Sequence, residues 1–148
     1  MRIDFDTYFM EIAKIVAMRS GCLRRSVGAV IVSPDKRIIA TGYNSAPIGV
    51  QECCDKGCCM RESSPTGSNL DTCFAIHAEE NALLQCSKYG ISCNNSTIYV
   101  TTSPCIFCLK AIINSGIKEV VYLEEYNSPL AKDLAKESGI VVRKYGVK

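Results

Sequence analysis

The chain is organised around two short stretches, His77-Ala78-Glu79 and Pro104-Cys105-Ile106-Phe107-Cys108. Together they supply one imidazole, two thiols and one carboxylate. A catalytic zinc is held by three protein ligands and leaves its fourth position to water. The metal lowers the pKa of that water toward neutrality, and a nearby carboxylate can then carry the proton. We therefore interpret His77, Cys105 and Cys108 as zinc ligands and Glu79 as the catalytic carboxylate.

Each of these residues has a simpler interpretation when it is taken alone. His77 is the only histidine of the chain, and a single histidine is more often a surface or core residue than a metal ligand. Free cysteines are often small buried hydrophobes, and an isolated C-x-x-C also occurs in redox sites. The two stretches in this order, separated by a plausible strand, favour zinc. Glu80 is the other candidate carboxylate, but it lies about 100° further round a helix and is expected to be solvated or paired.

Composition is typical of a globular protein with one domain, residues 1–148. The 17 basic and 15 acidic residues give a net charge of +2, which is too balanced for a dominant nucleic-acid surface. No run approaches the roughly 18 apolar residues of a membrane span, and the first residues lack the apolar core of a signal peptide. We therefore expect a cytoplasmic protein, in which metal sites are a more common use of the ten cysteines than disulfides. Cys86 and Cys93 are expected to be a core residue and a loop residue.

Helical and strand-like patterns alternate along the chain. The expected elements are a helix over 5–19, an antiparallel hairpin of strands 27–32 and 37–43, a helix over 75–87, a strand over 97–102, a helix over 104–116, a strand over 119–123, a helix over 128–138 and a strand over 140–145. Helices join the last three strands, so these strands are expected to pair in parallel. The pattern predicts an α/β fold: a five-stranded mixed sheet with an N-terminal hairpin, parallel C-terminal strands and helices on both faces. Gly28, inside the first strand, predicts a close backbone approach or a bulge.

The stretch over 44–73 lacks this periodicity and indicates a loop. Proline and glycine interrupt it, and it holds five cysteines: Cys53, Cys54, Cys58, Cys59 and Cys73. An irregular loop of about thirty residues is unusual inside a compact domain and is usually functional or held in place. Metal binding by the cysteines would be sufficient to hold it.

The two central stretches also carry a family resemblance, because H-x-E followed by P-C-x-x-C is typical of zinc nucleobase deaminases. From Tyr8 to Tyr145 the chain resembles the deoxycytidylate (dCMP) deaminase family, which has the three-layer α/β/α cytidine deaminase-like fold. The matching stretches are Val27-Gly28-Ala29-Val30-Ile31-Val32, Gly42-Tyr43-Asn44, His77-Ala78-Glu79 with Asn81-Ala82, Pro104-Cys105 with Cys108, and Gly116-Ile117-Lys118-Glu119-Val120. Gly42-Tyr43-Asn44, the cysteine-bearing insertion and Tyr126 are the more specific features.

The resemblance implies a second, structural zinc beside the catalytic one. Its ligand positions match Cys22, Cys53, Cys58 and Cys73. Four thiolates form a closed site that needs no open position. The register stays open, because Cys54 and Cys59 can each replace a neighbour.

The resemblance further implies hydrolysis of dCMP to dUMP and ammonia, a reaction that feeds thymidylate synthesis. Glu79 would take a proton from water, deliver it to the pyrimidine ring nitrogen and then protonate the leaving ammonia. The resemblance also implies a homo-oligomer, a hexamer, with dCTP as activator and dTTP as inhibitor.

Six residues are expected to bind the nucleotide: Asn44, Ala78, Ser103, Tyr126, Arg24 and Arg25. By resemblance, Asn44 would hold the deoxyribose and Tyr126 would lie near the nucleotide. Their simpler interpretations are a turn residue and an aromatic core residue. The pair Arg24-Arg25 precedes the first strand, where an arginine could grip a 5′-phosphate bidentately, although two arginines there could equally be solvated.

Two other functions stay open. The chain could deaminate tRNA adenosine or a free nucleoside, but its near-neutral charge counts against a tRNA substrate. It could instead be a non-catalytic interaction module stabilised by zinc. Glu79 argues against that alternative, because a purely structural zinc does not require a carboxylate there.

Overall fold

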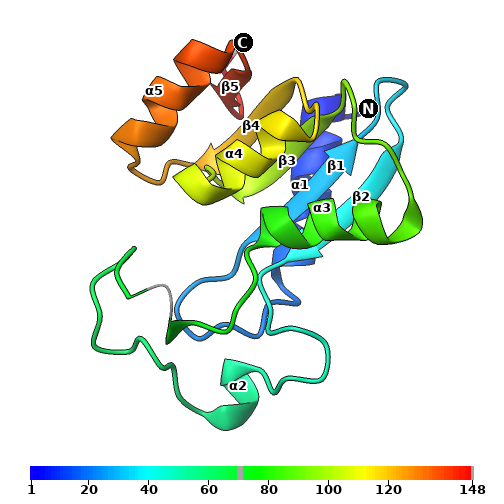
Figure 1. Cartoon of the computed structure of the whole chain (residues 1–148). Helices are drawn as coiled ribbons and strands as arrows, with labels where there is room; N and C mark the ends of the chain where they lie inside the picture. The colour runs from blue at the N-terminus through cyan, green and yellow to red at the C-terminus, as the bar shows by residue number, and fades with distance from the viewer. Residues whose placement is uncertain (70–71, 148) are drawn as a thin grey trace.

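The computed structural model describes residues 1–69 and 72–147 (Figure 1). Its elements are α1 (Phe5–Ala17), β1 (Gly28–Val32), β2 (Ile38–Tyr43), α2 (Cys53–Lys56), α3 (Ala78–Tyr89), β3 (Thr97–Thr102), α4 (Ile106–Asn114), β4 (Glu119–Glu124), α5 (Pro129–Ser138) and β5 (Val141–Lys144). Every expected helix and strand is present, within three residues of its expected bounds. No helix of the described ranges is both long and apolar enough to cross a bilayer.

Within the described residues the strands form one five-stranded sheet in the order β2-β1-β3-β4-β5. Strand β1 runs antiparallel to both β2 and β3, and it carries a register shift between Ile31 and Val32. Strands β3, β4 and β5 are parallel to one another. The predicted mixed sheet, with its N-terminal hairpin and parallel C-terminal strands, is therefore confirmed.

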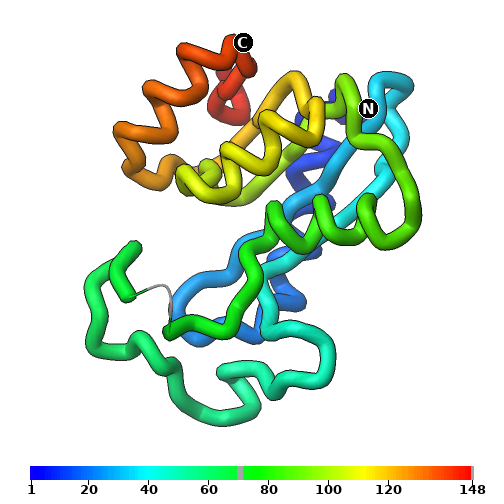
Figure 2. The backbone as a smooth tube through the Cα atoms, in the orientation of Figure 1, coloured from blue at the N-terminus to red at the C-terminus, as the bar shows by residue number. Residues whose placement is uncertain are grey.

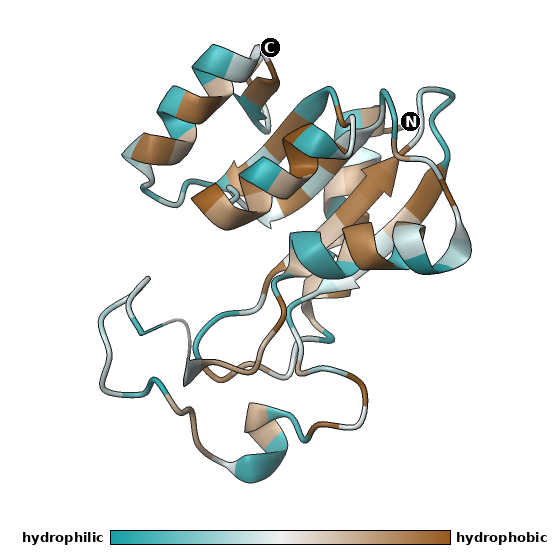
Figure 3. Ribbon diagram, in the orientation of Figure 1, coloured by the Kyte–Doolittle hydropathy of each residue, from teal (hydrophilic) through white to brown (hydrophobic). Residues whose placement is uncertain are grey.

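Helices cover the sheet on both faces, which gives the predicted three layers. Helix α1 lies behind the sheet in Figure 1, whereas α3, α4 and α5 lie in front of it. Successive strand residues point to opposite faces, so Val30, Tyr99 and Val121 pack toward α1 with Phe9. On the other face, a larger core holds residues of β1, β3, β4, α3 and α4: Ala29, Ile31, Ile98, Val100, Val120, Ala82, Leu109 and Ile112. In Figure 3 the apolar colour is accordingly concentrated on the central strands.

Two strand glycines allow helices to approach the sheet closely. A Cβ atom built on Gly28 would lie 2.1 Å from the Ala13 carbonyl oxygen of α1. On Gly42 it would lie 2.2 Å from the Ala78 carbonyl oxygen of α3. The close approach predicted at Gly28 is confirmed, and Gly42 brings the first turn of α3 directly against β2.

The insertion, which we define as residues 44–76, extends from the end of the sheet at which β2 stops (Figure 2). Ser45 and Ile76 close its base through two backbone hydrogen bonds of 3.2 and 2.8 Å. This pairing holds the chain extended before His77, so α3 begins at Ala78 and not at Ala75 as expected. The insertion is mostly irregular as predicted, but it contains the one-turn helix α2, which ends at Gly57 in the left-handed conformation.

Candidate active site and metal centre

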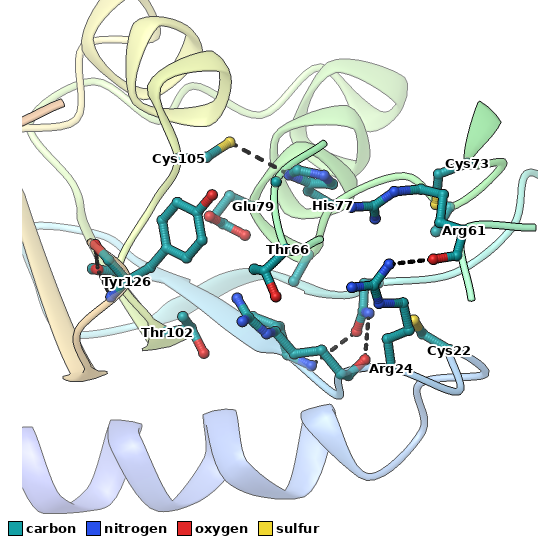
Figure 4. Close-up of a pocket in the computed structure, with 17 residues that line it drawn as sticks. Cys22, Arg24, Arg61, Thr66, Cys73, His77, Glu79, Thr102, Cys105 and Tyr126 are labelled. Atoms are coloured by element: carbon teal, nitrogen blue, oxygen red, sulfur yellow. Dashed lines mark hydrogen bonds between the residues drawn. The ribbon is translucent and has the colours of Figure 1, made fainter. Parts of the chain in front are cut away.

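The topology brings several chain segments to one end of the sheet. The start of β1 and the ends of β2, β3 and β4 meet there, because β1 runs opposite to the other three strands. Helices α3 and α4 also begin at this end, and His77 and Cys105 are their respective N-cap residues. A helix N-terminus favours negative charge and so stabilises a thiolate. Both sequence motifs therefore converge on a single place in the fold (Figure 4).

His77, Cys105 and Cys108 form a compact group of possible metal ligands. The Nδ1 atom of His77 lies 3.5 Å from Sγ of Cys105 and 3.3 Å from Sγ of Cys108. Tetrahedral zinc, with Zn–N and Zn–S bonds of about 2.0 and 2.3 Å, would separate these atoms by about 3.5 Å. In the described part of the chain, no other three histidine, cysteine or acidic ligand atoms lie within 4.8 Å of one another. The donor set and its spacing therefore fit zinc.

Cys105 and Cys108 shift the pKa of each other's thiol in opposite directions. The hydrogen bond between the thiols and the contact with His77 lower the pKa of Cys105 to about 4. The same hydrogen bond, together with burial, raises the pKa of Cys108. The Cys105 thiolate in turn raises the pKa of His77. A lowered pKa at Cys105 favours its thiolate, the form of cysteine that binds zinc.

Glu79 lies in the first turn of α3 beside this group. Its side chain is buried, with 5% of the residue exposed, and it lines the same cavity as His77 and Cys105, whereas Glu80 does not. Burial raises the pKa of the Glu79 carboxyl to about 7, because removal from water disfavours the charged form. A carboxyl with a pKa near neutrality can both accept and donate a proton at physiological pH.

The cavity beside Glu79 has a volume of about 180 Å³. All six residues expected to bind the nucleotide line it: Arg24, Arg25, Asn44, Ala78, Ser103 and Tyr126. Sequence analysis missed further lining residues, among them Arg61, Thr66 and Thr102. Thr102 ends β3 directly before the second motif, so the rule that ligands bind beyond the carboxyl ends of parallel strands could have indicated it. Arg61 and Thr66 lie in the irregular insertion and carried no such signal.

Several of the expected substrate-binding side chains also fix the wall of the cavity. The Oδ1 atom of Asn44 accepts a hydrogen bond of 2.8 Å from the Val27 N–H, and its Nδ2 donates to the Arg25 carbonyl at 2.7 Å. The Oγ atom of Ser103 accepts a hydrogen bond of 2.6 Å from the Tyr126 N–H. Asn44 therefore ties β2 to the segment before β1, and Ser103 ties the loops that follow β3 and β4.

The two adjacent arginines have different surroundings. Arg24 donates two hydrogen bonds to backbone carbonyls of the insertion, to Arg61 at 2.6 Å and to Ser64 at 2.9 Å. The guanidinium of Arg25 lies 5.5 Å from the centre of the Tyr126 ring, a cation–π contact. Both side chains line the cavity, but Arg24 already donates from each of its two terminal nitrogens to a backbone carbonyl.

A second group of cysteines surrounds a smaller cavity under the insertion. Its lining includes Cys22, Cys53, Cys59 and Cys73. Burial raises the pKa of Cys53, and so do the neighbouring sulfurs of Cys59, Cys22 and Cys73. Cys58 is exposed and does not line this cavity. Of these two neighbouring cysteines, which the sequence left as alternatives, Cys59 lines the cavity and Cys58 does not.

Comparison with known proteins agrees with this site. Residues 3–124 match the family model described as the cytidine and deoxycytidylate deaminase zinc-binding region. The chain belongs to this family.

Similarity extends over most of the chain. ComE operon protein 2 of Bacillus subtilis is 47% identical over 143 residues, which cover 95% of this chain and 71% of that protein. The deoxycytidylate deaminase of Schizosaccharomyces pombe is 44% identical over 97% of this chain, which spans only 45% of that enzyme. A crystal structure of the dCMP deaminase from cyanophage S-TIM5, in complex with dCMP and dUMP, aligns with a TM-score of 0.80 and 32% identity. That alignment covers 97% of this chain and 98% of the phage chain.

Proposed function

We propose that this chain catalyses the zinc-dependent hydrolytic deamination of dCMP to dUMP and ammonia. The observation that carries the proposal is the position of Glu79, a buried carboxyl with a pKa near 7 beside three residues whose spacing fits zinc. A purely structural metal site would not require such a group. Family membership and the similarity to a phage enzyme in complex with dCMP and dUMP support the choice of reaction and substrate.

His77, Cys105 and Cys108 would hold the zinc. When bound, the metal supplies the Lewis acidity that makes water an effective nucleophile near neutral pH. Glu79 accepts a proton from the attacking water and delivers it to the ring nitrogen next to the reacting carbon. A carbon–oxygen bond forms at the carbon that bears the amino group. Glu79 then transfers the second proton of the water to the amino group, the carbon–nitrogen bond breaks and ammonia leaves.

The cavity walls would hold the rest of the nucleotide. Asn44 and Tyr126 line the cavity, and both contact Arg25 in the segment that precedes β1; there they would contact the deoxyribose. Ala78 and Ser103 line it beside the proposed zinc ligands and would contact the base. The cation of Arg25 would contribute to binding of the 5′-phosphate.

A panel of cytosine and adenine substrates tests this function. The purified zinc-loaded protein would be assayed for ammonia release with dCMP, deoxycytidine, cytidine and a tRNA that contains an accessible adenosine. We expect dCMP to be converted with the highest kcat/KM. Equal rates with dCMP and deoxycytidine, or a preference for tRNA, would contradict the substrate, and a complete lack of ammonia from all four would contradict the function.

We further propose a second zinc ion, bound by Cys22, Cys53, Cys73 and Cys59. Two features support this site: the shared cavity of these four cysteines and the preference of zinc for four thiolates in closed structural sites. The four sulfurs do not form a group as close as that of His77, Cys105 and Cys108, so zinc binding would draw them together. Bound there, the metal would join Cys22, in the segment before β1, to Cys53 and Cys59 near α2 and to Cys73 near the end of the insertion. Cys58 was the fourth ligand expected from the resemblance, and it is the alternative that mutagenesis has to exclude.

The family resemblance supports further proposals about the whole protein. We propose that residues 1–148 form a single domain with the zinc-binding insertion, and that the chain assembles into a homohexamer. We also propose activation by dCTP, inhibition by dTTP and a cytoplasmic role in supplying dUMP for thymidylate synthesis. Sedimentation analysis and initial rates with each triphosphate test the assembly and its regulation.

A further inference from the structure

We propose that Arg61, a residue of the insertion, determines specificity by contacting the 5′-phosphate of the substrate, and that Arg24 is the positioning residue that holds Arg61 in place. This inference rests on the proposed function. Arg61 is only 9% exposed, yet it forms no ion pair with any described residue. Arginine is rarely this buried without a partner of opposite charge.

The guanidinium of Arg61 is held at one edge only. Its Nε donates a hydrogen bond of 2.8 Å to the Ser68 carbonyl, across a turn of the insertion. That bond leaves the two terminal nitrogen groups for another partner. The side chain extends from the insertion toward His77 in Figure 4, and it lines the same cavity as His77 and Glu79. The outer edge of the guanidinium is therefore available to a ligand in that cavity.

Arg24 fixes the backbone from which Arg61 projects. Its two terminal nitrogens donate to the carbonyls of Arg61 at 2.6 Å and Ser64 at 2.9 Å, two residues that an internal hydrogen bond already joins into a turn. With each terminal nitrogen bound to a backbone carbonyl of the insertion, the Arg24 guanidinium is directed at this turn. From the sequence, either Arg24 or Arg25 could contact the phosphate, or both could be solvated. The structure assigns Arg24 to the support of Arg61 instead.

Arg25 and Arg61 would approach the phosphate from different parts of the chain. Arg25 precedes β1 and packs on Tyr126, whereas Arg61 comes from the insertion. A 5′-phosphate carries about two negative charges at neutral pH, and arginine binds it through charge-assisted, often bidentate, hydrogen bonds. A nucleoside offers no such partner and would leave the buried Arg61 charge uncompensated. Arg61 would thus favour nucleotide over nucleoside.

The test compares Arg61→Ala, Arg61→Lys and Arg24→Ala with the exposed control Arg37→Ala, which lies in the turn between β1 and β2. For each variant, kcat/KM is measured with dCMP and with deoxycytidine, and the dissociation constants of dUMP and deoxyuridine are measured by calorimetry. We expect Arg61→Ala to lower the preference for dCMP about 10- to 100-fold, chiefly through KM, and to weaken dUMP binding by a similar factor. Arg61→Lys should recover part of the loss, because it keeps the charge but not the bidentate geometry.

The double variant Arg24→Ala/Arg61→Ala separates positioning from contact. If Arg24 acts through Arg61, the double variant loses no more dCMP preference than Arg61→Ala alone. If the loss of dCMP preference in the double variant equals the product of the two single losses, Arg24 contacts the phosphate itself. That result would overturn the assignment of Arg24 as a positioning residue. If kcat/KM falls equally with dCMP and deoxycytidine in both Arg61 variants, Arg61 has only a structural role. These outcomes are distinct from failure of the proposed function, in which the wild-type protein itself shows no preference for dCMP.

Discussion

The Sγ atom of Cys108 lies 3.3 Å from Nδ1 of His77, although 31 positions separate the two residues in the sequence. The contact depends on the way in which the sheet places the N-termini of α3 and α4 side by side. Gly42 allows α3 to lie against β2, and β3 leads directly into the segment that carries Cys105. Geometry suited to a metal therefore follows from the packing of two helices on one sheet face.

Glu79→Gln should abolish most turnover while the protein keeps its fold and its zinc. The amide can still hydrogen-bond but cannot carry a proton, and loss of general acid–base catalysis commonly costs about 10²- to 10⁴-fold in rate. Because one residue serves several proton transfers, we expect a loss at the upper end of this range. The measurement is kcat with dCMP, together with zinc content by atomic emission.

Glu80→Gln is the matched control for this prediction. Glu80 follows Glu79 in the same helical turn but does not line the cavity, so its variant should keep near-normal kcat. An equal collapse of both variants would show that the carboxylate has been misassigned.

Zinc analysis should find two ions per chain, held by different residues. Cys59→Ser should lose one equivalent and unfold more readily, because binding of a structural zinc contributes to folding stability. Cys58→Ser, its neighbour, should keep both ions because Cys58 is exposed outside the cavity. The reverse pattern would move the site to Cys58, and a single zinc in the wild-type protein would refute the second site.

Gly42→Ala and Gly28→Ala should both destabilise the fold, by about 1–3 kcal/mol, since each added Cβ meets a helix backbone. Their effects on the site should differ. Gly42 lies against Ala78, next to His77 and Glu79, whereas Gly28 lies against α1 on the opposite face. Zinc content and kcat per folded molecule should therefore fall only in Gly42→Ala. Equal losses of zinc and of kcat in both variants would show that the site does not depend on the α3–β2 contact.

An ion-pair network that links α1 to β4 and β5 should make the stability of the fold depend on pH. Asp6 accepts hydrogen bonds from Arg143 at 2.7 Å and from the Tyr99 hydroxyl at 2.7 Å. The Arg143 bond lowers the pKa of Asp6 in the folded state. A lowered folded-state pKa stabilises the fold above the usual value of 3.8, and that stability is lost as the pH falls through the folded-state value.

Asp6→Asn measures this contribution directly. The variant should be about 1 kcal/mol less stable than wild type at pH 6, a modest value because the pair is partly exposed and Arg143 keeps its bond to Glu119. Urea unfolding at a series of pH values should show the difference shrink below pH 4. A difference that stays constant down to pH 2.5 would contradict the role of the Asp6 carboxylate.

Much of the fold and the metal site could be predicted from sequence because the signals are local. His77 and Glu79 occupy one helix start, and Cys105 and Cys108 occupy another, so each pair acquires its geometry from a single turn. The strands carry continuous β-branched runs, and their connections determine which pairs are parallel. Such features require no knowledge of distant contacts.

The rest of the site depends on distant contacts. The start of α3 shifted to Ala78 because Ile76 pairs with Ser45. Whether Cys58 or Cys59 faces inward depends on how the chain leaves α2 through the left-handed Gly57. Arg61 lines the cavity, and its carbonyl accepts a hydrogen bond from Arg24, which is 37 positions away. None of these pairings produces a periodic pattern in the sequence.

The central claim, hydrolytic deamination at the His77–Glu79 site, is tested most directly by following oxygen from solvent into product. Zinc-loaded protein would be incubated with dCMP in water enriched in ¹⁸O, and the products would be identified by mass spectrometry. We predict dUMP that carries one solvent oxygen on its base, with one equivalent of ammonia, and neither product from Glu79→Gln. Recovery of unchanged dCMP from the wild-type protein, or equal dUMP formation by Glu79→Gln, would contradict the account.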